Sequence, residues 1–427
     1  MATSSFARLP GFRDFPPEEL ALRSHIFDAW RGVSLRYGFL EYDGPPLEPL
    51  GLYVEKSGDE IVDQLYTFTD KGERDVALRP EMTPSLARIL GDRSRGMSKP
   101  IRWFAMPQLF RYERQQRGRL REHFQWNVDL VGEEGVAADA EVLAVAVDGL
   151  RELGLTAGDF RARVSDRVLL SALLGVLGVS EEGLPAAFAV IDKLERLPRE
   201  KAVGILSSNA GLSGAQAGRV LETVSSATLD TLSEALGSRD DSGPAVERLR
   251  DYLGALGAMG LGDYVEIDLG IVRGLAYYTG IVFELFDRQG ELRAICGGGR
   301  YDRLLELVGG EPLPAVGFGM GDVVLGELLA ERELVPEFAS SLDYFIVTVS
   351  WEQRDEALRL AHGLREKGHS VSYALREQGV GKQMKVASKE GAREVLIVGP
   401  DELARGCVVA RDMSTGGQRE IQLAELI

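Results

Sequence analysis

A short run of alternating residues, 124–130, constrains this chain more than any other segment. Its apolar positions alternate with Gln125, Asn127 and Asp129. Because successive side chains of a strand point to opposite faces, the pattern predicts a half-buried strand with one polar face. Gln125 and Asp129 would lie about 13 Å apart on that face, where they would contact opposite ends of a small ligand.

An apolar run, residues 101–112, precedes this strand, and the charged segment 113–122 lies between them. We therefore predict an antiparallel hairpin with a long basic loop. Residues 99–121 include seven basic residues and one acidic residue. Either the loop is solvated, or a bound anion offsets the repulsion among its charges. Arg111, at the strand end, would present its planar guanidinium to a phosphate or a carboxylate.

The 427-residue chain carries a net charge of −17. Taken alone, this charge argues against a nucleic-acid partner, because binding to phosphates needs Lys and Arg. Residues 343–427, however, contain 12 basic and 13 acidic residues, so almost all of the acidic excess lies in the first 342 residues. We expect an acidic body with local basic surfaces, which disfavours indiscriminate binding to nucleic acid and still permits a specific partner.

The spacing of cysteines and histidines argues against several kinds of site. Cys296 and Cys407 are far apart, and the four histidines have no ligand spacing, so we expect neither a structural metal nor a disulfide framework. The sequence has no long apolar run and no apolar signal core at its start, so we expect a cytoplasmic protein with no membrane partner. No GxxxxGKS/T phosphate loop occurs, and we interpret residues 317–321 as a glycine-rich strand end.

Periodicity in the first 335 residues predicts helices around short strands. Helices are expected over residues 17–37, 140–153, nearly all of 168–257, and a segment ending near 333. Residues 39–68 indicate short strands and turns, because three prolines exclude a long helix there. Strand character returns at residues 264–286, before the glycine-rich stretch 297–321.

We interpret residues 336–342 as a linker. Beyond it, strands and helices alternate in the order 344–349, 353–367, 370–374, 381–390 and 395–398. This alternation predicts a small α/β domain with a largely parallel sheet.

Three residues each have two interpretations. Arg273 lies in an apolar segment, residues 271–278, where a guanidinium needs a partner, either an internal carboxylate or a ligand. Glu81 and Thr83 either contribute to the start of a helix or contact a ligand.

Taken together, these segments resemble the histidyl-tRNA synthetase family of class II aminoacyl-tRNA synthetases over essentially the whole chain. Residues 45–53 resemble motif 1, the dimer-interface element of the family. Residues 78–83, 110–114 and 125–129 resemble motif 2 and its flanks. The two histidine-specific motifs resemble residues 273–278 and 297–302, and residues 381–413 resemble part of the anticodon-binding domain.

The resemblance implies two domains. The first is an α+β catalytic domain with an antiparallel sheet, residues 1–335, carrying a helical insertion at about 168–257. The second is a C-terminal α/β anticodon-binding domain, residues 343–427.

The resemblance also implies an amino-acid pocket. The histidine-binding residues would be Glu81, Thr83, Gln125, Asp129, Tyr277 and Tyr278. Glu81 would pair with the α-ammonium group, and Asp129 and Tyr278 would each contact one imidazole nitrogen. The pocket floor would consist of Gly298, Gly299, Arg300 and Tyr301.

The implied catalytic residues are Arg111 and Arg273, which would hold the α-phosphate of ATP from two sides. The ATP site would comprise Arg111, Glu113, His123 and Arg273. The histidine carboxylate would attack the α-phosphorus to give histidyl-adenylate and pyrophosphate, and a ribose hydroxyl of tRNA(His) would then accept the histidine. The implied partners are L-histidine, ATP with Mg²⁺, tRNA(His), and a second copy in a homodimer formed through the catalytic domain; no metal ligands from the chain are implied.

Three positions depart from the family pattern. Val324 stands where motif 3 usually has an Arg that covers the adenine and touches the γ-phosphate. His123 stands where a Phe usually stacks on the adenine, and Ala276 replaces an acidic residue. The variant motif 3 resembles that of cyanobacterial and plastid-type members.

Two alternatives stay open. The regulatory subunit of ATP phosphoribosyltransferase resembles the catalytic domain, and Val324 would suit it. The C-terminal domain, together with Arg111 and Arg273, disfavours that interpretation. A class II synthetase for another amino acid is disfavoured by the two histidine-specific motifs.

Overall fold

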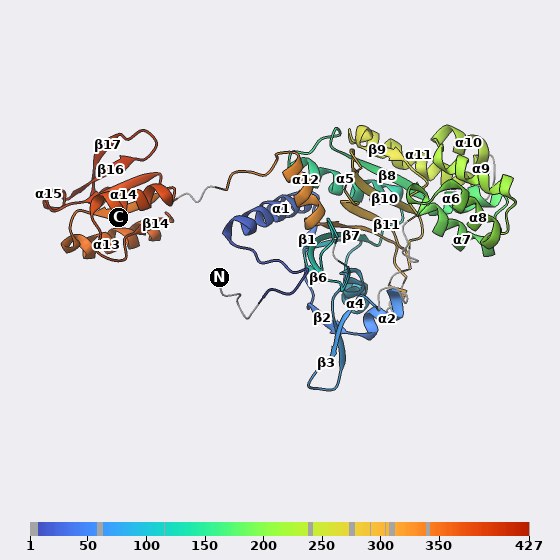
Figure 1. Cartoon of the computed structure of the whole chain (residues 1–427), viewed down its shortest axis with the longest axis horizontal. Helices are drawn as coiled ribbons and strands as arrows, with labels where there is room; N and C mark the ends of the chain where they lie inside the picture. Colours follow the sequence, from blue (N-terminus) through green and yellow to red (C-terminus); the bar gives the residue numbers. More distant parts are fainter. Residues whose placement is uncertain are drawn as a thin grey trace. The chain divides into compact units, whose positions relative to one another are not determined.

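The computed structural model describes residues 7–57, 63–114, 116–237, 242–272, 278–290, 292–303, 305–306, 312–338 and 342–426. The chain divides into two compact units, residues 1–336 and 337–427 (Figure 1). The finer division, a linker at 336–342 and an insertion at about 168–257, stays a prediction.

The first unit is built on a mixed, mainly antiparallel sheet. In spatial order, its described strands are β1 (Leu40–Glu41), β5 (Ile101–Ala105), β7 (Glu122–Val131), β12 (Ala315–Gly321), β11 (Cys296–Arg300), β10 (Ile281–Asp287), β8 (Phe160–Asp166) and β9 (Val265–Ile267). The short strand β6 (Gln108–Phe110) also pairs with β7. Only the outermost pairs, β1–β5 and β8–β9, are parallel among these strands. The expected antiparallel sheet is therefore confirmed.

The predicted hairpin is also confirmed. Ile101 lies opposite Val131, and Phe110 lies opposite Glu122. The apolar run forms two strands, β5 and β6, because residues 106–107 interrupt the ladder.

The expectation that β7 is half buried was wrong. Asn127 and Asp129, on its polar face, are each only 5% exposed. This face is covered because α4 (Thr83–Arg93) packs over it, with Leu86 and Leu90 in one apolar cluster with Val131. The polar side chains of β7 therefore face an enclosed space.

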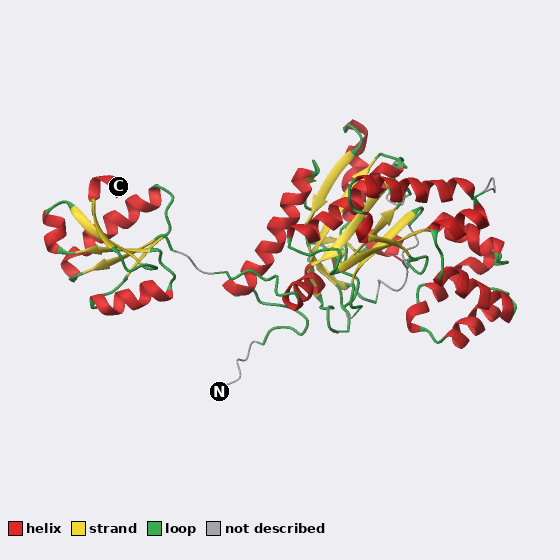
Figure 2. Ribbon diagram, turned by 90° about the horizontal axis from the view of Figure 1, so that it is seen from above, coloured by secondary structure: helices red, strands yellow, loops and turns green. Residues whose placement is uncertain are grey.

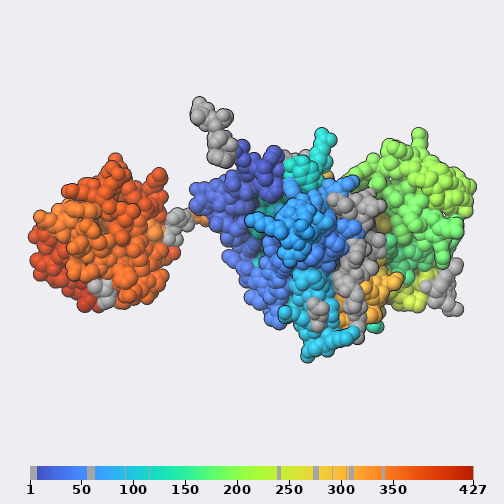
Figure 3. Space-filling model, turned by 90° about the horizontal axis from the view of Figure 1, so that it is seen from below, coloured from blue at the N-terminus to red at the C-terminus, as the bar shows by residue number. Residues whose placement is uncertain are grey.

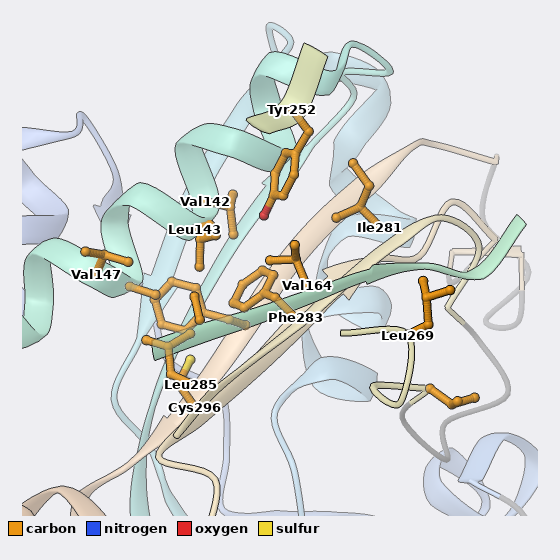
Figure 4. Packing of buried hydrophobic residues seen from close by; sticks show 14 of the residues in the cluster. Val142, Leu143, Val147, Val164, Tyr252, Leu269, Ile281, Phe283, Leu285 and Cys296 are labelled. Atoms are coloured by element: carbon orange, nitrogen blue, oxygen red, sulfur yellow. The ribbon is translucent and has the colours of Figure 1, made fainter. Parts of the chain in front are cut away.

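The opposite face of the sheet carries α1 (Pro17–Arg36), α5 (Val136–Glu152) and α12 (Asp322–Glu331). The Trp126 ring stacks on Trp30 with centroids 5.7 Å apart, and Phe318 meets it edge-on at 5.0 Å. Figure 4 shows Val142, Leu143 and Val147 of α5 in the same buried cluster as Leu285 of β10. These contacts join three distant segments of sequence into one core.

A helical module occupies the region predicted to be helical. Its main helices are α6 (Arg167–Val176), α7 (Leu184–Ile191), α8 (Arg199–Asn209), α9 (Gly214–Ser225), α10 (Leu229–Leu236) and α11 (Gly243–Ala258). Figure 2 shows these helices gathered beside the sheet, and in Figure 3 the same residues form a green lobe of the first unit. Helix α11 packs against α5. Because α5 is covered by the sheet and by α11, its residues 142–147 are all buried.

The segment 39–68 differs in part from its prediction. It contributes β2 (Leu47–Pro49) and β3 (Tyr66–Thr69), which both pair with β4 (Asp75–Leu78), but it also forms the helix α2 (Gly51–Ser57). This helix begins after Pro49, where no further proline interrupts the chain. The predicted helix at 17–37 is confirmed as α1, and the glycine-rich stretch forms β11 and β12.

The second unit contains β14 (Val371–Tyr373), β13 (Tyr344–Thr348), β15 (Glu394–Val398), β16 (Cys407–Asp412) and β17 (Gln418–Gln422), in this spatial order. Its longer helices are α13 (Arg354–Glu366) and α14 (Val380–Lys389). β13 is parallel to both neighbours, but β16 and β17 are antiparallel. The expectation of a largely parallel sheet was therefore wrong for these strands, because only the short helix α15 (Pro400–Ala404) and then a turn connect them.

Within the described part of the chain, no helix has both the length and the apolar composition needed to cross a bilayer.

Gly149 of α5 makes the contact with Trp126 testable. A Cβ atom at Gly149 would lie 2.8 Å from Cη2 of the Trp126 ring, which is held between Trp30 and Phe318. Gly149→Ala should destabilise the protein by about 1–3 kcal/mol through overpacking, measured as a lower thermal midpoint.

The matched control is Gly254→Ala in α11, where a Cβ atom would meet nothing within 4 Å. That change should stabilise the protein by about 0.5–1 kcal/mol, because alanine favours helix. Equal increases in midpoint for both variants would contradict the proposed packing.

Candidate active site

A pocket lies on the polar face of β7, between that strand, the next two strands of the sheet, β12 and β11, and the start of α4. Its lining residues are Glu81, Thr83, Arg111, Gln125, Asn127, Asp129, Tyr278, Gly297, Tyr301, Gly317, Phe318 and Gly319. Seven of these were predicted as site residues: Glu81, Thr83, Arg111, Gln125, Asp129, Tyr278 and Tyr301. They come from segments up to 220 positions apart, so only the fold brings them together.

Glycines make room for the polar side chains of β7. Gly317 pairs with Asp129 across the sheet, and a Cβ atom there would lie 2.7 Å from the Tyr301 hydroxyl. A Cβ atom at Gly319 would lie 2.7 Å from the carboxamide carbon of Gln125. Larger residues on this face would occupy the space that these groups use.

Asp129 is the buried acid of the pocket. The hydroxyl of Tyr301 donates a hydrogen bond to its Oδ1. Burial raises the pKa of Asp129 to about 7, although the hydrogen bond from Tyr301 acts in the opposite direction. Among the described residues no cation forms an ion pair with this carboxyl. It is therefore suited to accept a hydrogen bond from a ligand N–H.

Glu81, Thr83 and Arg111 line the same pocket. Arg111 follows β6, and its Nε donates to the carbonyl of Pro80 at 2.9 Å. Glu81 is buried, and Thr83 is the first residue of α4. The N-cap position is Met82 and no side chain caps this helix, so the capping interpretation does not account for Glu81 or Thr83.

The pocket combines groups that suit an amino acid. Glu81 can pair with an ammonium group and Arg111 with a carboxylate or phosphate. Asp129, with Tyr301 behind it, can hold a polar side chain that donates a proton.

His123 and Glu113 lie outside the pocket lining. Burial and the nearby charges of Arg111, Arg13 and Arg119 lower the pKa of His123 to about 3, so its imidazole is neutral near pH 7. Glu113 is buried and forms an ion pair with Arg119. Glu113 belongs to the basic loop that follows Arg111, and His123 lies in β7, directly after that loop.

The predicted pocket floor needs correction. Arg300 does not line the pocket: its Nη2 lies 2.6 Å from Asp139 Oδ2, on the α5 side of the sheet. A Cβ atom at Gly298 would lie 2.7 Å from Phe283, in the main core. Gly299 points toward Tyr278 but is not a lining residue. For Gly298 and Arg300 the cause is the twofold alternation along β11, which places them on the face opposite to the pocket.

The floor is instead formed by Gly297, Gly317 and Gly319, with Tyr301 beside them. Sequence reasoning missed these glycines together with Asn127 and Phe318. Two signals were present: Asn127 lies between Gln125 and Asp129 on the polar face, and the glycines recur at every second residue. Arg273, Ala276 and Tyr277 lie outside the described residues.

Several arginines of the basic hairpin form ion pairs within the first unit. Arg102 pairs with Glu141 of α5. Arg117 pairs with two carboxylates of α12, Glu327 and Glu331. Arg111, by contrast, forms no ion pair with any described residue, so its charge is available to a ligand.

The described residues contain no group of three or more His, Cys, Asp or Glu side chains that could hold a metal ion.

The antiparallel sheet, its pocket lined by acidic and basic side chains, and the separate α/β unit define a class II aminoacyl-tRNA synthetase. The family model described as histidyl-tRNA synthetase matches residues 11–321, and the anticodon binding domain model matches residues 343–427. The chain belongs to the histidyl-tRNA synthetase family.

Individual relatives agree with this assignment. A "Histidine--tRNA ligase" from Opitutus terrae is 46% identical, over 98% of this chain and 96% of the relative. A "Histidine--tRNA ligase, chloroplastic/mitochondrial" from Arabidopsis thaliana is 41% identical, over 97% of this chain and 85% of the relative. The crystal structure of histidyl-tRNA synthetase from a Nostoc species has a TM-score of 0.82 at 26% identity and covers 99% of both chains.

The raised pKa of Asp129 predicts a pH-dependent stability. In the unfolded chain the pKa of an aspartate is about 3.9, so between there and about 7 the unfolded state loses this proton while the folded state keeps it. The free energy of unfolding of the unliganded protein therefore falls by up to about 1.4 kcal/mol per pH unit through this group in that window. Above the window this group causes no further fall.

Asp129→Asn removes this titration and keeps an acceptor for the Tyr301 hydroxyl. The thermal midpoint of the variant minus that of the parent should rise from pH 5.5 to about 7 and stay constant above pH 8. A difference that is flat over the whole range would contradict the raised pKa.

Proposed function

We propose that this chain attaches histidine to tRNA(His), with histidyl-adenylate as the intermediate. The observation that carries the proposal is one pocket holding Glu81, Arg111 and the buried Asp129–Tyr301 pair, in a chain of this family. The first step joins the histidine carboxylate to the α-phosphorus of ATP and releases pyrophosphate. The second transfers histidine to a ribose hydroxyl at the 3′ end of the tRNA.

In this proposal the pocket binds histidine by both of its ends. Glu81 takes the α-ammonium group, helped by Thr83 and Gln125. Asp129 accepts a hydrogen bond from one imidazole nitrogen, and Tyr278 contacts the other. Tyr277 is assigned to the same pocket by its motif alone.

The ATP site extends from Arg111. Arg111 binds the α-phosphate and the histidine carboxylate, so that the two reacting groups meet with their negative charges offset. His123, neutral and next to β12, suits the face of the adenine, and Glu113 holds the loop through Arg119. Arg273 is assigned to the opposite side of the α-phosphate by its motif. Mg²⁺ enters with the ATP phosphates, since this cation is usually held through substrate phosphates and a few protein oxygens.

Two other functions are less well supported. A synthetase for another amino acid would not explain a full-length match at 46% identity to a histidine–tRNA ligase. A regulatory subunit without tRNA charging would not explain the anticodon binding domain, or an Arg111 that has no ion-pair partner among the described residues.

The test is ATP–pyrophosphate exchange with purified protein, Mg²⁺ and histidine. Exchange should depend on histidine, and Arg111→Ala should lower its rate by about 10²–10³, the usual effect of losing a group aimed at developing charge. Arg74→Ala, which removes the same charge from an exposed turn, is the control and should exchange normally. Absence of exchange in the parent protein would refute the proposed function.

The second unit offers a surface for tRNA. A groove at the carboxyl ends of β13 and β14 is lined by Trp351, Arg354, Tyr373 and Leu375, among other residues. Arg354 lies over the Trp351 ring at 5.7 Å, and Leu375 is 85% exposed. Aromatic rings and arginines at such an edge suit unpaired nucleotide bases.

Trp351→Ala should therefore weaken the binding of tRNA without affecting the formation of the adenylate. Loss of base stacking is worth about 1–3 kcal/mol, so the KM for tRNA in aminoacylation should rise about 10-fold or more, with exchange unchanged. His362→Ala, at an exposed position of α13, should change neither. An unaltered KM for tRNA in Trp351→Ala would remove this groove from the tRNA interface.

We further propose a cytoplasmic location and a homodimer formed through the first unit. The segment that resembles motif 1 and its neighbours expose Leu40, Leu47, Val54 and Phe68, which a partner subunit would cover. A molar mass of one chain by light scattering would contradict the dimer.

A further inference from the structure

The tip of the basic loop is fixed to the rest of the first unit. Gln116 and Arg119 exchange backbone hydrogen bonds of 3.2 and 3.0 Å, with Gly118 at a φ of +69° between them. The amide of Gly118 donates to Glu327 Oε1 of α12 at 3.1 Å, and Arg117 pairs with the same carboxylate. The loop tip is thus held where its backbone approaches α12.

Two side chains from other segments meet this tip. A Cβ atom added at Gly118 would lie 3.1 Å from Cγ2 of Val324 and 4.0 Å from Cδ of Arg293. Arg293, in the connection between β10 and β11, also donates a hydrogen bond from Nη2 to Gln116. Arg293 therefore reaches the place beside Val324, the position where motif 3 usually carries an arginine.

Arg293 is one of three guanidinium groups that converge here. Burial, together with the positive charges of Arg293 and Arg111, lowers the pKa of Arg119. Glu113 pairs with Arg119, but among the described residues no carboxylate pairs with Arg111 or Arg293. With His123 neutral, two positive charges remain uncompensated, an arrangement that an anion would stabilise.

The order of these groups indicates which part of the anion each would meet. Arg111 lines the amino-acid pocket, where the reacting carboxylate and α-phosphate meet, whereas Arg119 and Arg293 do not line it. A phosphate chain that leaves Arg111 toward the loop tip would pass Arg119 and end near Arg293. Arg293 is exposed at this point and open to a ligand.

We propose that Arg293 binds the terminal phosphates of ATP and supplies there the positive charge that Val324 cannot. This proposal rests on the ATP site of the proposed function and adds a residue from a different segment. Arg293 acts in binding and in positioning the pyrophosphate leaving group; it forms no covalent bond.

The test compares two nucleotides by calorimetry on the full chain, Mg²⁺–ATP and AMP, which lacks the β- and γ-phosphates. Arg293→Ala should weaken the binding of Mg²⁺–ATP about 10- to 100-fold, which is the range for lost hydrogen bonds to a charged group. The binding of AMP and of histidine should stay unchanged. The matched control is Arg288→Ala, which removes the same charge from an exposed position on the same β10–β11 connection. Arg293→Gln keeps a hydrogen-bond donor for Gln116 and removes the charge. This second variant therefore separates the effect of the charge from any effect on folding.

Each outcome decides the proposal. Weaker Mg²⁺–ATP binding in both Arg293 variants, with AMP unchanged, supports it. An effect no larger than that of Arg288→Ala, or an equal loss of AMP binding, overturns it. Failure of the parent to catalyse histidine-dependent exchange would refute the proposed function, whereas the nucleotide comparison would still decide the role of Arg293.

Discussion

The structure of the first unit depends on the packing of β7 between two unlike layers. On one side Trp126 stacks on Trp30 and meets Phe318, which ties α1, β7 and β12 into the main core. On the other side the same strand presents Gln125 and Asp129 to the pocket. Any shift of β7 by one residue would exchange these two sets, so the apolar packing also sets the register of the site.

The chemistry of the pocket follows from its enclosure. Asp129 is buried without an ion-pair partner among the described residues, so its pKa rises, and the space it needs exists only because glycines replace side chains on β11 and β12. Arg111 also lacks a described carboxylate partner, although its Nε is held by a carbonyl. The fold thus places Asp129 and Arg111 in one cavity without an ion-pair partner among the described residues, where a zwitterionic ligand and a phosphate can bind.

The net charge of −17 has a structural counterpart. Carboxylates of α5 and α12 pair with arginines of the basic hairpin and hold it to the body. The acidic body therefore orders a loop whose positive charges would otherwise repel one another. Arg111, which lines the pocket, and Arg293, at the loop tip, have no carboxylate partner among the described residues. This arrangement concentrates the available positive charge where phosphates are proposed to bind.

The sequence by itself determined the elements and their polarity: the hairpin around the basic loop, the helical module, the alternating second unit, and residues such as Glu81, Arg111 and Asp129 as a candidate site. Local periodicity and motif spacing suffice for these, because they depend on neighbours in the chain. Only the tertiary structure decided that the polar face of β7 is buried, that Arg300 pairs with Asp139 instead of forming the pocket floor, and that Arg293 stands beside Val324. These features depend on which distant segment covers which face, and the physical reason is that burial and pairing are properties of packed surfaces, which no local pattern specifies.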